Sequence, residues 1–177
     1  MSVQYNVATL LKEPVGSTRE YEVDSRVLID EATPRHQRVV GRTRLLRIKH
    51  GVLVISHLEG VQQDRCSRCL RGIEVRLQVG FEEEFFANVD AETATDPGPP
   101  EETGVFRIDR KHILDMEEAV RQYWTAGLPM QPLCRPDCNG LCPRCGLDLN
   151  ENTCSCEPDD DQRWSPLRQL AQQMEGK

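Results

Sequence analysis

Alternating apolar and polar positions dominate the first half of the chain, as is typical of half-buried β-strands. The clearest alternation lies in GIEVRLQVG, residues 72–80, where Ile73, Val75, Leu77 and Val79 alternate with mostly polar residues. Successive side chains of a strand point to opposite faces of a sheet. One face of this strand is therefore expected to be buried and the other solvated.

The same texture recurs in three earlier stretches, REYEVD (19–24), QRVVGRTRLLRIKH (37–50) and GVLVISHL (51–58). Turns are predicted at His50-Gly51 and at Gly60 with the polar residues that follow it. Because no helical pattern separates these strands, they predict an antiparallel β-sheet or a small barrel.

Helical spacing is restricted to short stretches, which makes the predicted fold class α+β. Residues 5–12 predict one short helix, and residues 105–108 a short strand. Asp115 is expected to cap a second helix that ends at Gly127 and Pro129. The apolar positions of this helix recur at helical spacing: Met116, Ala119, Val120, Tyr123 and Trp124.

Changes in composition divide the chain into three predicted parts. Residues 1–128 form a strand-rich domain, interrupted at 90–103 by DAETATDPGPPEET, a predicted flexible acidic loop. Residues 129–157 are rich in cysteine. Residues 158–177 hold an acidic stretch and a short predicted helix with Trp164, Leu167 and Leu170 along one side.

Charge is unevenly distributed along the chain. The total is acidic, with a net charge of −7, which taken alone speaks against binding to nucleic acid. Between positions 35 and 76, however, ten basic side chains face three acidic ones. This stretch predicts a basic face, with these candidate nucleic-acid contacts: Arg42, Arg44, Arg47, Arg68, Arg71 and Arg76.

The basic side chains also have a simpler interpretation, in which they are a solvated β face paired with acidic segments. The acidic runs at 82–84 and 159–161 offer a third hypothesis, a protein-binding module or chaperone for a basic ribosomal protein. Solvated charge is the alternative for these runs as well.

Six of the eight cysteines lie between positions 134 and 156, in CRPDCNGLCPRCGLDLNENTCSC, and the other two form CSRC at 66–69. A two-residue spacer lets both thiolates of a CxxC turn point at one metal ion. Gly146, after CPRC, allows the left-handed conformation that often follows such a pair. The sequence therefore predicts zinc ligands at Cys66, Cys69, Cys134, Cys138, Cys142, Cys145, Cys154 and Cys156.

Eight thiols suffice for two structural zinc ions with four cysteines each. Only eight residues separate Cys145 from Cys154, so the pair Cys142 and Cys145 can form a local site with the pair Cys154 and Cys156. The economical assignment then joins Cys66 and Cys69 to Cys134 and Cys138 across the fold. Other pairings stay open at this level.

Other chemistries of the cysteines compete with structural zinc. Disulfides suit an oxidising compartment, whereas the N-terminus lacks the features of a secretory signal and no apolar run spans a membrane, so a cytoplasmic location is expected. A redox-active CxxC would open a helix, but CSRC lies in strand-like sequence. A hydrolase with an open zinc site would need a further ligand beside CSRC, such as His57. No candidate general acid or base lies at a spacing in the sequence that supports this hypothesis.

The residues quoted above, with NVATLLKEPVGSTREYEV at the start and DDDQRWSPLRQL near the end, resemble the YceD family of large ribosomal RNA subunit accumulation proteins. CSRC and CNGLCPRCGLDLN carry the resemblance most specifically; where the family has Asp-Pro-Arg near its C-terminus, this chain has Asp161-Gln162-Arg163. Membership implies a cytoplasmic bacterial or plastid protein needed for normal levels of large-subunit rRNA.

The leading hypothesis is thus a non-enzymatic zinc-binding factor of ribosome biogenesis. Its expected partner is large-subunit rRNA, a pre-ribosomal particle or a ribosomal protein, with no membrane and no small-molecule substrate. A zinc-dependent, nuclease-like hydrolase and an acidic chaperone for a basic ribosomal protein are the alternatives.

Overall fold

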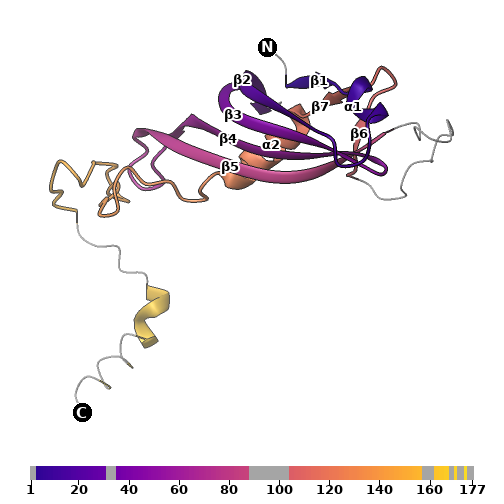
Figure 1. The fold of residues 1–177 in the computed structure, drawn as a ribbon. Coiled ribbons are helices and arrows are strands. Elements are labelled where there is room, and N and C mark those ends of the chain that lie inside the picture. Colours follow the sequence, from indigo (N-terminus) through magenta and orange to yellow (C-terminus); the bar gives the residue numbers. More distant parts are fainter. Residues whose placement is uncertain are drawn as a thin grey trace.

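A five-stranded sheet forms most of the fold (Figure 1). The computed structural model describes residues 3–30, 35–87, 104–156 and 162–167, and positions 170 and 174. The strands follow the order β2 (Thr18–Asp30), β3 (Arg35–Ile48), β4 (Gly51–Arg65), β5 (Gly72–Ala87) and β6 (Phe106–Ile108). The first four are antiparallel, as predicted, while β6 pairs with β5 in parallel.

Two strands that the sequence analysis did not predict form a second, small sheet. They are β1 (Gln4–Asn6) and β7 (Ile113–Asp115), which pair antiparallel. The predicted N-terminal helix is present as α1 (Ala8–Lys12), and the second predicted helix as α2 (Glu117–Gly127). The N-cap position of α2 is Met116 and not Asp115 as predicted, although the Asp115 carboxylate accepts the backbone N–H of Glu117 at 2.9 Å. The α+β class is confirmed.

Helix α2 lies across one face of the large sheet and closes the core (Figure 1). Its apolar side packs against the inward-facing residues of the strands, because alternate positions of each strand point to this face. The innermost large side chains, each less than 2 % exposed, include Trp124, Phe85, Leu45, Ile108, Leu114 and Met116. Tyr123 is only half-buried, and its ring stacks on Phe81.

The turn predicted at Gly60 is wrong. Strand β4 runs straight through this position to Arg65, and Gly60 pairs with Leu77 of β5. A Cβ atom at Gly60 would lie 2.6 Å from the backbone oxygen of Arg38 and 2.7 Å from the Trp124 ring. The glycine therefore marks a close approach of backbone and indole inside a strand, which is the other common meaning of a strand glycine.

Two sequence predictions concern residues outside the described ranges: the acidic loop 90–103 and the acidic run 159–161. Beyond them, a short 3₁₀ turn, η1 (Gln162–Trp164), leads into helical residues, and Trp164, Leu167 and Leu170 are exposed. In the part of the chain that the structure describes, every helix is too short or too polar to cross a membrane.

Candidate metal centre

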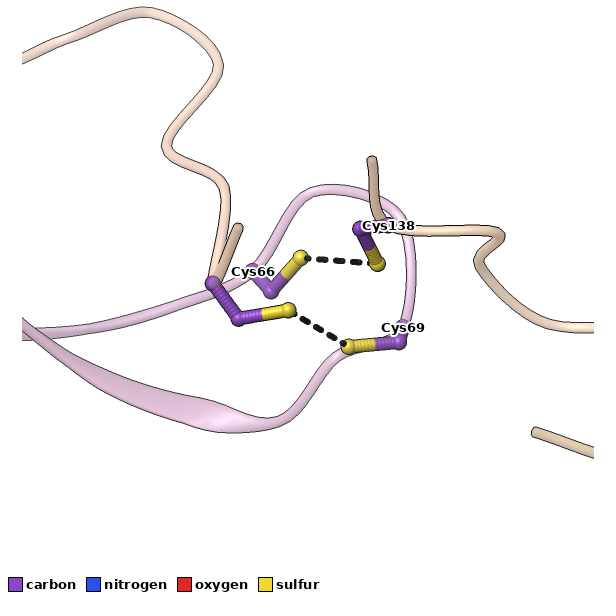
Figure 2. Close-up of side chains that lie close together, drawn as sticks. Cys66, Cys69 and Cys138 are labelled. Atoms are coloured by element: carbon purple, nitrogen blue, oxygen red, sulfur yellow. Dashed lines mark hydrogen bonds between the residues drawn. The ribbon is translucent and has the colours of Figure 1, made fainter. Parts of the chain in front are cut away.

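The first CxxC turn is the tip of the long β4–β5 hairpin, at the end of the sheet away from α1 and β6 (Figure 1). The backbone N–H of Cys66 donates to the oxygen of Arg71 at 2.8 Å, and the N–H of Leu70 to the oxygen of Cys66 at 2.9 Å. These two bonds fold CSRCLR into a tight loop. The thiols of Cys66 and Cys69 therefore point to the same side (Figure 2).

Two cysteines from far along the chain complete the first cluster. The sulfur of Cys66 lies 3.8 Å from that of Cys138, and the sulfur of Cys69 lies 3.7 Å from that of Cys134 (Figure 2). All four sulfurs are within 4.8 Å of one another. Zn–S bonds of about 2.3 Å at tetrahedral angles hold two sulfurs about 3.8 Å apart, whereas a disulfide needs about 2.05 Å. The four sulfurs fit one tetrahedral metal ion.

A second cluster of the same kind is formed by Cys142, Cys145, Cys154 and Cys156. Its CxxC turn has the same backbone hydrogen bonds as the first. The N–H of Cys142 donates to the backbone oxygen of Leu147 at 2.8 Å, and the N–H of Gly146 to the backbone oxygen of Cys142 at 2.9 Å. All eight cysteines are free thiols. The structure thus groups them as the economical assignment did, into two sets that could each hold a metal ion.

The residue after each CxxC pair adopts a left-handed backbone. At Gly146 φ is +72°, as the glycine in the sequence suggested. The corresponding residue of the first turn is Leu70, with φ +60° and an exposed side chain. The first turn thus uses this conformation without a glycine, which costs about 1 kcal/mol or more.

Backbone N–H groups favour a thiolate at the first cysteine of each turn. The N–H of Cys69, helped by those of Cys134 and Arg68, lowers the pKa of Cys66 to about 6 against the effect of burial. The N–H groups of Cys145 and Arg144 lower the pKa of Cys142 to about 6 in the same way. By contrast, burial first and the neighbouring thiols second raise the pKa of Cys134 to about 12. Each turn thus offers a thiolate, the form that binds metal.

The two clusters are tied together by the segment between them. The amide of Asn150 donates to the sulfur of Cys138 at 3.5 Å, and its oxygen accepts the backbone N–H of Asn139 at 2.8 Å. Gly140 packs over the first turn, where a Cβ would lie 3.1 Å from the oxygen of Arg68. The N–H of Leu141 donates to that same oxygen at 3.2 Å. CNGLCPRCGLDLN therefore binds the first turn through its polar residues as well as its cysteines.

The clusters differ in exposure. Cys66, Cys69 and Cys138 are buried in a small apolar cluster with Ile73, Leu133 and Leu141 around them. In the second cluster only Cys142 is buried, while Cys145 and Cys156 are exposed. The first cluster is therefore the more shielded from solvent and chelators.

Arg47, predicted as a nucleic-acid contact, is buried in the structure, so this prediction is corrected. Only 7 % of the residue is exposed, and its guanidinium donates to the backbone oxygens of Leu11 at 3.2 Å and Gly51 at 3.0 Å, and to that of Ile48. Arg47 stabilises the junction of α1 with the β3–β4 turn. A local charge count could not reveal this, because it ignores which face of the strand each position occupies.

Two other predicted contacts are engaged in ion pairs. Arg44 pairs with Glu20 of the neighbouring strand at 2.7 Å. Arg71 pairs with Asp148 at 3.3 Å and also with Glu151, and these bonds join the first turn to the second cluster. Acidic residues of other segments thus offset much of the local positive charge.

The remaining predicted contacts, Arg42, Arg68 and Arg76, are exposed. Arg42 stands opposite Glu22 and His57 in the register. Arg68 donates one bond, to the backbone oxygen of Cys138 at 2.8 Å. Arg76 stands opposite Val61.

His57 is not close to the cysteines, which argues against the open-site hydrolase that would have used it. It lies on the outer face of β4, opposite Arg42 and Gly80, nine residues before Cys66. Nine residues of extended strand span about 30 Å. Each cluster already contains four cysteine sulfurs, so both are typical of closed, structural sites.

Comparison with known families places the chain. The model of the family described as large ribosomal RNA subunit accumulation protein YceD matches residues 54–171, which include both CxxC turns and all eight cysteines. The chain belongs to the YceD family. Two relatives with this family name are chloroplastic YCED homologues, one of Zea mays, 34 % identical over 34 % of this chain and 23 % of its own length, and one of Arabidopsis thaliana, 26 % identical over 57 % and 32 %.

Bacterial relatives of this YceD protein are also found. An uncharacterised protein of Mycobacterium tuberculosis is 35 % identical over 127 residues, or 72 % of this chain and 59 % of its own length. The YceD chain therefore spans a little under three fifths of the mycobacterial relative. No solved structure matches it significantly.

Proposed function

We propose that this YceD protein is a non-catalytic factor that supports accumulation of large-subunit rRNA by binding the rRNA or its precursor particle. The observation that carries the proposal is the family match across both metal-binding turns. The plant relatives are named for large ribosomal RNA subunit accumulation. Exposed arginines on the sheet and at the first turn offer phosphate contacts, chiefly Arg68 and Arg76.

We further propose that both clusters hold zinc and that the metal has a structural role. Four thiolates at tetrahedral spacing are typical of closed zinc sites, which leave no position for a reacting water. The first ion would clip residues 129–156 to the tip of the β4–β5 hairpin. The protein would act in the cytoplasm, or in the plastid for the plant relatives.

Co-sedimentation tests this function. Tagged protein in lysates resolved on sucrose gradients is expected to migrate with large-subunit precursors at low salt and to dissociate as salt rises, since phosphate contacts are salt-dependent. Protein that stays at the top of the gradient at every salt concentration would contradict the proposal. Hydrolysis of RNA by the purified protein, lost on removal of metal, would instead favour the nuclease-like alternative.

A further inference from the structure

The two hairpins of the large sheet separate at one end and leave a cleft. The β3–β4 ladder ends at the pair Val40 and Glu59, although β4 continues to Arg65 and β3 begins at Arg35. A cleft of about 650 Å³ opens in this gap, beside the first CxxC turn. Its lining is Ile29, His36, Gln37, Gln62, Gln63, Asp64, Arg65 and Gly72.

Exposed arginines lie on the strands that border this cleft. Arg26 and Arg38 form a directly opposed pair on β2 and β3, on one side of the gap. On the other side, Arg76 of β5 stands opposite Val61 of β4. Arg65 lines the cleft itself. We name Arg26, Arg38, Arg65 and Arg76 the arginine rim.

The rim breaks the charge pattern of the exposed side of these strands. Farther along β2 and β3, the arginines at 42 and 44 each stand opposite a glutamate, Glu22 and Glu20. At the rim, Arg26 stands opposite Arg38, and like charges directly opposed across strands destabilise a sheet. An exception to a locally consistent pattern is expected at functional sites.

Acidic side chains lie near the rim, but in the described part of the chain only Asp24 pairs with one of its arginines. Asp24 holds Arg38 with two bonds of 2.8 and 2.9 Å. Asp64 lines the cleft, and Glu74, two residues from Arg76 on β5, accepts a bond from Gln63 at 2.8 Å. Arg26, Arg65 and Arg76 form no ion pair with any residue that the structure describes. Three guanidinium groups of the rim thus have no ion-pair partner within the described ranges of the chain.

The lining of the cleft distinguishes one kind of polyanion from another. The carboxylates of an acidic peptide would bind to the arginines alone and would make no use of the side chains that line the cleft. Amide and imidazole side chains such as Gln37, Gln63 and His36 match the hydrogen-bonding edges and the flat faces of nucleobases. Gln62 is held in place by the indole N–H of Trp124 at 3.4 Å.

We infer that the arginine rim and the cleft bind single-stranded RNA, with phosphates on Arg26, Arg65 and Arg76 and an unstacked base between the hairpins. This inference rests on the proposed function and specifies where and in what form the RNA would be bound. It also moves the principal RNA surface from the arginines at 42 and 44 to the end of the sheet next to the first metal cluster.

The test compares two double variants that lose the same charge. Arg26→Gln with Arg76→Gln removes rim contacts, and Arg42→Gln with Arg44→Gln is the matched control on the same face. Binding of a short labelled oligouridylate is measured by fluorescence anisotropy at several salt concentrations. The rim variant is expected to bind about tenfold more weakly, with a salt slope smaller by about 1.4, since each lost phosphate contact on a single strand removes about 0.7. The control should change affinity by less than about twofold.

A cleft variant, Gln37→Leu, is expected to weaken binding while leaving the salt slope unchanged, because it removes a base contact and no phosphate contact. Circular dichroism spectra and metal content should be unchanged in all variants, which would show that the fold is kept.

Equal losses of RNA affinity in the rim and control variants would refute the arginine rim as the binding site, since diffuse positive charge would explain them. This result would leave the proposed function intact. Poly-glutamate that binds as tightly as RNA and depends equally on Arg26 and Arg76 would overturn RNA as the ligand in favour of an acidic protein. Wild-type protein that binds no RNA, in the oligonucleotide assay and on gradients alike, would remove both the rim and the proposed function.

Discussion

Replacement of one cysteine in each half of the first cluster tests whether a single ion joins them. Cys69 lies at the hairpin tip and Cys138 lies 69 residues later, with Cys66 in contact with Cys138 and Cys69 in contact with Cys134. If one ion binds all four sulfurs, Cys69→Ser and Cys138→Ser each leave a three-sulfur site. Both variants should then lose the same ion to a chelator.

The expected loss of folding stability follows from the length of the loop that the ion would close. Cys69 and Cys134 are 65 residues apart, and closing a loop of that size in the unfolded chain is worth about 4 kcal/mol by the chain-entropy estimate used for disulfides. The second cluster closes a much shorter loop, with eight residues between Cys145 and Cys154, worth about 3 kcal/mol. The first ion is therefore expected to contribute the larger share of stability.

Non-additivity provides the decisive measurement. Zinc per chain is counted by elemental mass spectrometry after dialysis against a chelator, and the free energy of unfolding is obtained from urea titrations followed by circular dichroism. Combining Cys69→Ser with Cys138→Ser should cost no more than either change alone, about 4 kcal/mol, because the ion is already lost. Combining Cys69→Ser with Cys145→Ser should cost about 7 kcal/mol, because two ions are lost.

The opposite pattern would refute the shared ion. If Cys69→Ser retained both ions, or if the Cys69→Ser and Cys138→Ser costs were additive, the two halves would not bind the same metal. Limited proteolysis gives an independent readout, because loss of the first ion should expose the chain after residue 128 to cleavage, whereas Cys145→Ser should leave the junction protected.

Three further substitutions test the local geometry, each by its urea midpoint against wild type. Leu70→Gly should stabilise the protein by about 0.5 kcal/mol by relieving the left-handed backbone, and Leu70→Val should destabilise it by about 1 kcal/mol; two equal effects would contradict the strain. Gly60→Ala should cost about 2–3 kcal/mol, because the added methyl group would lie 2.7 Å from the Trp124 ring, and a neutral result would mean that β4 can shift. Arg47→Leu should cost about 3 kcal/mol by leaving buried backbone oxygens without donors, and unchanged stability would show that water replaces the guanidinium.

The strands and the two CxxC turns could be predicted from the sequence because their signals are local. Alternation marks β2 to β5, and the CxxC spacing marks both turns. The partition of the cysteines followed from the short spacer between Cys145 and Cys154, which left only one economical partner for CSRC. Strands β1 and β7 are three residues each, too short for any periodicity to be recognised.

The basic surface could not be predicted from charge along the chain, because the register decides which charges meet. Arg44 and Arg26 look alike in sequence, yet one stands opposite Glu20 and the other opposite Arg38. Arg47 belongs to the inner face and Arg44 to the outer one. The contact of Asn150 with the sulfur of Cys138 could not be predicted either, because in the sequence only the position of Asn150 at the end of the motif LDLN pointed to it.

The position of the first cluster has a physical reason in the length of the β4–β5 hairpin. Beyond Glu59, strand β4 loses its partner β3 and pairs only with β5 up to the turn at Cys66. A two-stranded ribbon is only marginally stable in water. Four cysteine sulfurs at its tip, two of them from the segment after α2, would fix that ribbon through a metal ion. The same ribbon forms one wall of the cleft and carries two rim arginines, Arg65 and Arg76, so the stability of the metal cluster would set the geometry of the proposed RNA site.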